Sequence, residues 1–182
     1  MLETQKPLTL VVVEVPSSLE RVVIEVEGWL ELECPEKALE KVTSLLDHPA
    51  GRAVGLVLQV RAFVTMNDFE KALEALQNLS EFEHDQEWAD LTEAWCRKRL
   101  DDLPGAVGCM ERLIDRDKCS IGHFNLACYL ALMGERQRAL DELAIACGMD
   151  PRFRKLLEDE KDLESLHDDP SFKALLLRKR SG

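Results

Sequence analysis

The sequence predicts an all-α protein built as a solenoid of helix pairs, and three observations support this prediction. Four alanines are spaced 34, 34 and 33 residues apart: Ala38, Ala72, Ala106 and Ala139. A period of this length is typical of a helix–turn–helix repeat. A bulky apolar residue follows each alanine four residues later, and turn-forming residues separate the helical stretches.

Residues 1–16 stand apart from the repeats. The run LTLVVVEV, residues 8–15, is rich in β-branched side chains and precedes Pro16, which predicts an extended segment. Ser17 and Glu20 then have the spacing of a capping box, and they predict the start of the first helix.

Residues 17–151 predict four helix pairs, with the boundaries 17–49, 50–83, 84–118 and 119–151. Pro35 suits the first turn of the second helix, where its missing N–H costs no hydrogen bond. In pairs two and three, the predicted turns and N-caps are the dipeptides 67–68 and 101–102, Asn-Asp and Asp-Asp. Gly134 supplies the turn of the fourth pair.

Residues 152–182 predict a terminal cap for the array. It consists of a short helix near residues 153–157, a last helix that begins at Asp169–Pro170, and a closing basic tail. Solenoid arrays need such polar ends because a terminal repeat has no neighbour on one side.

The spacing resembles that of the tetratricopeptide repeat (TPR), in which a small residue is followed four positions later by a bulky one. The pairs are Ala38/Val42, Ala72/Leu76, Ala106/Met110 and Ala139/Leu143. The fourth repeat, FNLACYLALMGERQRALDELAIACGMDP, is the closest match. The aromatic position nine residues before each alanine holds Trp29, Phe63, Arg97 and Leu130, so Arg97 departs from the pattern. The resemblance implies a right-handed superhelix whose concave side is lined by the first helix of each pair.

The C-terminal sequence DLESLHDDPSFKALL, residues 162–176, resembles the ending of bacterial TPR arrays. The resemblance implies a bacterial source.

Composition narrows the function classes. The 182-residue chain carries a formal charge of −12, so binding to nucleic acid is not expected. No stretch is long and apolar enough to predict a membrane span. Six cysteines without a CxxC pair, and no signal peptide, predict a cytoplasmic protein with reduced thiols.

The resemblance also implies where a partner binds. The expected partner-binding groove contains Val54, Val57, Arg61, Trp88, Leu91, Trp95, Lys98, Ile121, Phe124, Asn125 and Cys128. Its centre is apolar, as interfaces often are. The paired cationic residues with which some family members hold a chaperone's C-terminal carboxylate are absent from the matching positions, so chaperone tails are not the expected partner.

The expected function is therefore that of a non-enzymatic adaptor that binds a peptide or protein segment. One alternative is a small acidic secretion-type chaperone or regulator that holds a hydrophobic client. Another is a structural homo-oligomer, such as a homodimer, in which residues 1–16 fill the groove.

Sequence motifs for chemistry are weak. Phosphate loops, GxSxG and HExxH are absent. Cys119, His123 and Cys128 are the nearest approach to a metal-binding set, but a fourth ligand is not evident and a structural role is expected. We expect no catalytic residue, no metal and no cofactor.

Overall fold

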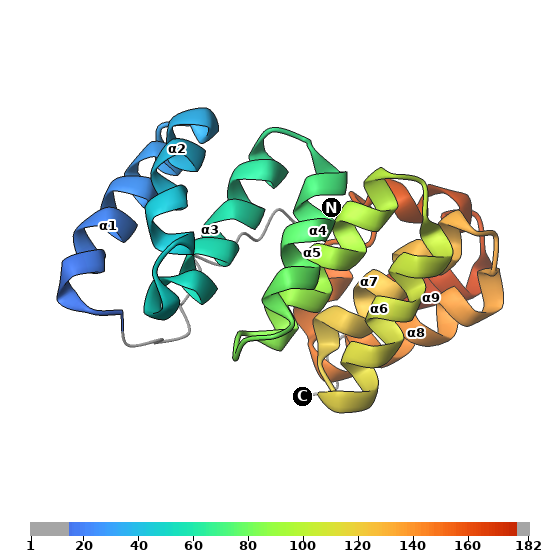
Figure 1. Cartoon of the computed structure of the whole chain (residues 1–182). Helices are drawn as coiled ribbons and strands as arrows, with labels where there is room; N and C mark the ends of the chain where they lie inside the picture. The colour runs from blue at the N-terminus through green and yellow to red at the C-terminus, as the bar shows by residue number, and fades with distance from the viewer. Residues whose placement is uncertain (1–14, 178–182) are drawn as a thin grey trace. The chain divides into compact units, whose positions relative to one another are not determined.

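The computed structural model describes residues 15–177, and all regular secondary structure within this range is helical (Figure 1). The prediction of an all-α chain is confirmed. The predicted extended segment, residues 1–16, lies almost entirely outside the described residues, as does the basic tail. None of the described helices is long and apolar enough to cross a membrane.

The chain divides into two compact units, and the division falls at Asp90, inside a helix. We call residues 15–89 the N-terminal unit and residues 90–177 the C-terminal unit. Each is described by itself.

The N-terminal unit contains two helix pairs and the start of a third. Its helices are α1 (Ser17–Glu31), α2 (Pro35–Leu46), the 3₁₀ turn η1 (Pro49–Gly51), α3 (Arg52–Thr65) and α4 (Phe69–Leu79). Neighbouring helices contact one another in chain order, and two apolar clusters fill the space between them. The helix α5 (Gln86–Arg99) begins in this unit and continues into the next.

The C-terminal unit has a larger continuous core. It contains the rest of α5, then α6 (Leu103–Arg116), α7 (Ser120–Leu132) and α8 (Arg136–Met149). Three short elements follow, namely η2 (Pro151–Lys155), η3 (Lys161–Leu166) and α9 (Pro170–Leu177). The predicted short helix near residues 153–157 is thus a 3₁₀ turn, and η3 was not predicted.

The same backbone turn recurs within all four pairs. Its left-handed residue, with a φ between 54° and 78°, is in turn Glu33, Asn67, Asp101 and Gly134. In each pair the N–H of the next residue donates to the carbonyl five residues back, at 2.9 Å. These bonds define the Schellman motif, which satisfies the free carbonyls at a helix end. The 34-residue period of the sequence is therefore also a period of the backbone.

The alanines that mark the period are fully buried. Each sits in the first turn of the second helix of its pair, where its N–H donates to the N-cap carbonyl at 3.0–3.2 Å. The position twelve residues earlier is also fully buried and holds Val26, Val60, Ala94 and Ala127. The alanines at these positions let the helices of a pair pack closely, whereas Val26 and Val60 place a larger side chain at the small position of pairs one and two.

The predicted caps are confirmed in pairs two and three. The Asp68 side chain accepts from the N–H of Lys71 at 3.3 Å, and Asp102 accepts from Gly105 at 3.0 Å. Pro35 also lies in the first turn of α2, as predicted.

The predicted capping box at the first helix is wrong. Ser17 is the first residue of α1, Pro16 occupies the N-cap position, and no side chain caps the helix. The first backbone N–H groups instead donate to the Pro16 carbonyl, at 2.7 Å from Leu19 and 3.3 Å from Glu20. The extended backbone of Pro16 turns directly into the helix, so Ser17 is already helical and its side chain does not serve as the cap.

Candidate interaction surface

The predicted groove residues are divided between the two units. Val54, Val57, Arg61 and Trp88 belong to the N-terminal unit, and the other seven belong to the C-terminal unit. The predicted groove residues therefore form two subsets, one in each unit, and each subset is described within its own unit.

In the N-terminal unit, three of the four residues remain partly exposed. Val54 is buried in the core between the first helices. Val57 and Trp88 are half-buried and pack against the apolar cluster of α3 and α4. Arg61 is also half-buried, and its Nη1 lies 3.5 Å from the carboxylate of Glu27 on α1. These three side chains form a partly exposed surface that combines two apolar groups with one cationic group.

In the C-terminal unit, two predicted groove residues are core residues. Phe124 is 1% exposed and Cys128 is also buried. Leu91 and Ile121 are half-buried and pack against the same core, while Trp95 and Asn125 are half-buried. Phe124 and Cys128 are therefore not exposed to a partner in this conformation.

The residues that cover α7 come from the end of the chain, residues 150–177, which we call the C-terminal segment. The Phe153 ring stacks on Phe124 with centroids 4.7 Å apart. The turn η3 contacts α7, and Leu163 and Leu166 of η3 are fully buried.

An ion pair fixes the C-terminal segment to α5. The Lys98 ammonium pairs with the Asp162 carboxylate, and these side chains are only 17% and 14% exposed. A pair this well shielded from water is screened little by salt. Lys98, which was predicted to face a partner, thus contacts the chain's own carboxylate.

The buried thiols of this unit have a structural role. Burial raises the pKa of Cys128 well above its usual value, and it raises that of Cys96 to about 12. A protonated, buried thiol is a poor nucleophile and a poor metal ligand.

The three-residue set considered for metal binding does not form a site. The His123 Nδ1 lies 2.5 Å from a carboxylate oxygen of Glu142 on α8, so the imidazole has a structural partner. Within residues 15–177, no group of three or more His, Cys, Asp or Glu side chains is arranged to hold a metal ion.

Arg97, the residue that departs from the aromatic pattern, joins a helix to the turn that follows it. Its guanidinium contacts Glu93 at 2.8 Å and Asp102 at 2.7 Å. The hydrogen bond from Arg97, together with that from the Gly105 N–H, lowers the pKa of Asp102 below its usual value. An ionic contact therefore takes the place of apolar packing at this turn.

Comparison with known proteins identifies the architecture. No family model matches the sequence, and no curated protein matches it. Among solved structures, MamA is 14% identical, with a TM-score of 0.65 over 83% of this chain and 92% of its own. The MamA RS-1 ArsTM double mutant is 11% identical, with a TM-score of 0.68 over 87% and 94%. YrrB, described as a TPR protein with an unusual peptide-binding site, is 13% identical, with a TM-score of 0.63 over 87% and 94%.

The chain has a TPR-like fold. At these identities the comparison speaks for the fold alone, and it agrees with the recurring turns and the buried alanines described above.

Reasoning from the sequence missed how the C-terminal segment covers its TPR-like repeat. A signal for it was present, because the pattern Asp-Pro-x-Phe-x-x-Leu-Leu occurs at residues 150–157 and again at residues 169–176. In both copies the aspartate accepts from the backbone N–H two residues later, at 2.9 and 2.8 Å, and the phenylalanine is buried. A doubled pattern with buried aromatic residues indicates a segment that packs on the protein.

Proposed function

We propose that the protein is a non-enzymatic adaptor that binds a segment of a partner protein. The observation that carries this proposal is the set of large apolar side chains that stay half-exposed on the first helices of the TPR-like pairs. They are Val57 and Trp88 in one unit, and Leu91, Trp95 and Ile121 in the other. Half-exposed tryptophan is a favoured anchor at protein interfaces.

The peptide-binding site named in the description of YrrB supports this proposal for a chain of the same fold. Of the predicted groove residues, we retain as partner contacts those with exposed surface. Arg61 and Asn125 supply polar groups beside the apolar ones. A cytoplasmic location is also proposed, and it is supported by six cysteines, none of which forms a disulfide bond in the described part of the chain.

Site-specific photo-crosslinking tests the proposal. A photoreactive phenylalanine analogue at Trp95 is expected to capture one partner from the source cell, and the same analogue at Trp88 tests the N-terminal unit. The matched control is Ala144, which is exposed on α8, a second helix of its pair. Equal capture from Ala144 and Trp95, or none from Trp95 and Trp88, would contradict the proposal.

Deletion of residues 1–16 separates the adaptor from the self-filled alternative. If this segment covers the groove, its removal raises the binding of a hydrophobic dye and the crosslinking yield at Trp95. If the full chain forms a dimer at high concentration and the truncated chain does not, the result favours the structural homo-oligomer over the adaptor. No change in dye binding, mass or crosslinking would eliminate the segment as the occupant.

A further inference from the structure

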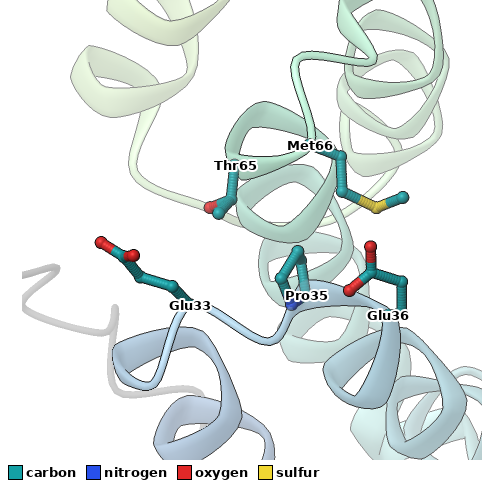
Figure 2. A pocket seen from close by; sticks show the side chains of 5 residues that line it. All are labelled: Glu33, Pro35, Glu36, Thr65 and Met66. Atoms are coloured by element: carbon teal, nitrogen blue, oxygen red, sulfur yellow. The ribbon is translucent and has the colours of Figure 1, made fainter.

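A hollow of about 490 Å³ opens in the N-terminal unit, and none of the predicted groove residues lines it. It is lined by Glu33, Pro35, Glu36, Thr65 and Met66. Glu33 lies in the turn between α1 and α2, and Pro35 and Glu36 are the first residues of α2. Thr65 and Met66 lie at the C-terminal end of α3, and Figure 2 shows Pro35 between the two glutamates.

The floor of the hollow is apolar. Pro35 is the buried first residue of α2, and Met66, which follows the last residue of α3, is 37% exposed. Leu32, next to Glu33 in the chain, is 68% exposed. The hydroxyl of Thr65 donates to the carbonyl of Arg61 at 2.9 Å, so it is already satisfied within the helix.

The rim of the hollow carries two carboxylates that have no cationic partner. Within the described part of the chain, neither Glu33 nor Glu36 forms a hydrogen bond or an ion pair through its side chain. By contrast, Glu25 of the same unit pairs with Lys41 at 2.9 Å. Acidic residues outnumber basic ones by more than two to one between residues 15 and 89, so the surroundings also favour a cation.

We propose that this hollow binds an arginine of a partner protein, flanked by an apolar residue. The aliphatic part of the arginine side chain lies on Pro35 and Met66, and its guanidinium lies between the carboxylates of Glu33 and Glu36. The flanking residue covers Leu32. Arginine fits better than lysine because the guanidinium is planar, weakly hydrated and able to contact two carboxylates at once.

The repeat itself points to the same chemistry. One period after Thr65, the chain carries its own guanidinium at Arg99. The second pair has a threonine at this position, so the wall of the hollow lacks the cation that the third pair carries one period later. The substitution Thr65→Arg therefore supplies that cation and fills the hollow from within.

Binding is tested with a blocked tripeptide, acetyl-Leu-Arg-Leu-amide, and with methyl-labelled methionine. Because the contacts are few and exposed to water, the tripeptide is expected to bind weakly, with a Kd on the order of 1 mM. The Met66 methyl signal is expected to shift saturably, while that of Met149, exposed on α8, stays unchanged. The Glu analogue of the peptide is expected to shift neither signal.

Matched variants locate the effect. The pair Glu33→Gln and Glu36→Gln is expected to weaken binding at least fivefold. The pair Glu31→Gln and Glu40→Gln removes the same charge from exposed positions that do not line the hollow, and it is expected to weaken binding less than twofold.

A second comparison adds a cation instead of removing carboxylates. Thr65→Arg is expected to abolish the Met66 shift, whereas Gln77→Arg, exposed on α4, preserves it. The proposal is overturned if the Glu peptide shifts Met66 equally, if Glu31/Glu40 and Glu33/Glu36 variants weaken binding equally, or if no shift occurs at 10-fold the expected Kd. Because the probe and the surface both differ from those of the groove, failure here leaves the adaptor proposal standing.

Discussion

Asp102 shows how a single side chain both closes a turn and starts a helix. One carboxylate oxygen accepts from the N–H of Gly105, and the other accepts from the guanidinium of Arg97. The same carboxylate thus satisfies a free donor at the start of α6 and neutralises a cation near the end of α5.

The substitution Asp102→Asn retains an oxygen that can cap α6 but removes the charge that pairs with Arg97. It is therefore expected to lower the free energy of unfolding by up to about 1 kcal/mol at pH 7. The folded-state pKa of Asp102 lies below the unfolded value of 3.8, chiefly because of Arg97. Its ionic contribution is therefore complete above pH 3.8 and is lost as the pH falls through the lower, folded-state pKa. Urea unfolding at pH 7, 5 and 3 measures the free energy of unfolding of both proteins. The difference between the wild type and the variant is expected to be smallest at pH 3.

The control for this experiment is Asp115→Asn. Asp115 is exposed on the same helix, and we expect a change below about 0.5 kcal/mol. An Asp102 variant as stable as the control at pH 7 would show that the ion pair with Arg97 contributes nothing to stability.

At the scale of single elements, two glycines predict opposite effects of the same substitution. A Cβ at Gly55, on α3, would lie 3.0 Å from the Cβ of Leu45 and 3.0 Å from a methyl group of Leu46 on α2. A Cβ at Gly28, on α1, meets nothing within 4 Å. Gly55 therefore permits two helices to approach closely, whereas Gly28 serves no packing purpose.

We expect Gly28→Ala to stabilise the protein by up to about 1 kcal/mol, because alanine is the better helix former. We expect Gly55→Ala to destabilise it by about 1 kcal/mol or more, because overpacking exceeds the same gain in helix propensity. Urea unfolding of the two variants in parallel measures both changes in the free energy of unfolding. Stabilisation by Gly55→Ala would mean that α2 and α3 separate readily.

The C-terminal segment forms part of the core of the C-terminal unit, so a substitution within it is expected to affect the stability of that unit. Phe153→Ala is expected to destabilise the protein by about 3 kcal/mol, because the ring fills space against Phe124. The variant is also expected to bind a hydrophobic dye more strongly, since Phe124 becomes accessible. Lys155→Ala, an exposed change in the same turn, is the control, and equal dye binding by the two variants would contradict this role.

The helices and turns also show which parts of the fold can be predicted from the sequence alone. The helices, the small residues and the caps of pairs two and three follow local rules, so period and turn chemistry predicted them. The sequence predicted a terminal cap, but the way in which the C-terminal segment covers α7 was not predictable from local rules. It depends on contacts such as Lys98 with Asp162, which are 64 residues apart in the chain.

The candidate site was less predictable than the fold for a related reason. Mapping by repeat position identifies which residues lie on the first helix of each pair, but it does not identify what covers them. Phe124 and Cys128 match groove positions in the sequence, yet they are core residues because the chain itself packs on them. The Glu33–Glu36 hollow had no counterpart in the motifs and appeared only when three elements were assembled.

At the scale of the whole molecule, the thiols distinguish the two units. The four buried cysteines, Cys96, Cys109, Cys128 and Cys147, all lie in the C-terminal unit. Cys34 in the N-terminal unit and Cys119 in the C-terminal unit are half-buried. Burial also raises the pKa of Cys109 to about 11, which keeps that thiol protonated near neutral pH.

Labelling with a thiol reagent at pH 8 is expected to modify Cys34 within minutes. The four buried cysteines are expected to react at least 100-fold more slowly, at the rate at which the C-terminal unit opens. Mass spectrometry of timed samples assigns each site, and a denatured sample gives the endpoint of six. Equal rates at Cys34 and Cys128 would show that the C-terminal unit is not closed in solution.

The turn at Arg97 has a consequence for the solution conditions in which the protein works. At the matching position the other three turns carry uncharged side chains, Trp29, Phe63 and Leu130. The Trp29 and Phe63 rings each lie beside a lysine ammonium, with Lys37 4.4 Å and Lys71 5.6 Å from the ring centroids. Arg97 instead relies on two partly exposed carboxylates, whose attraction extends about 10 Å in 0.1 M salt and about 3 Å in 1 M salt. Concentrated salt is therefore expected to weaken the turn at Arg97 most, because two ion pairs take the place of apolar packing there.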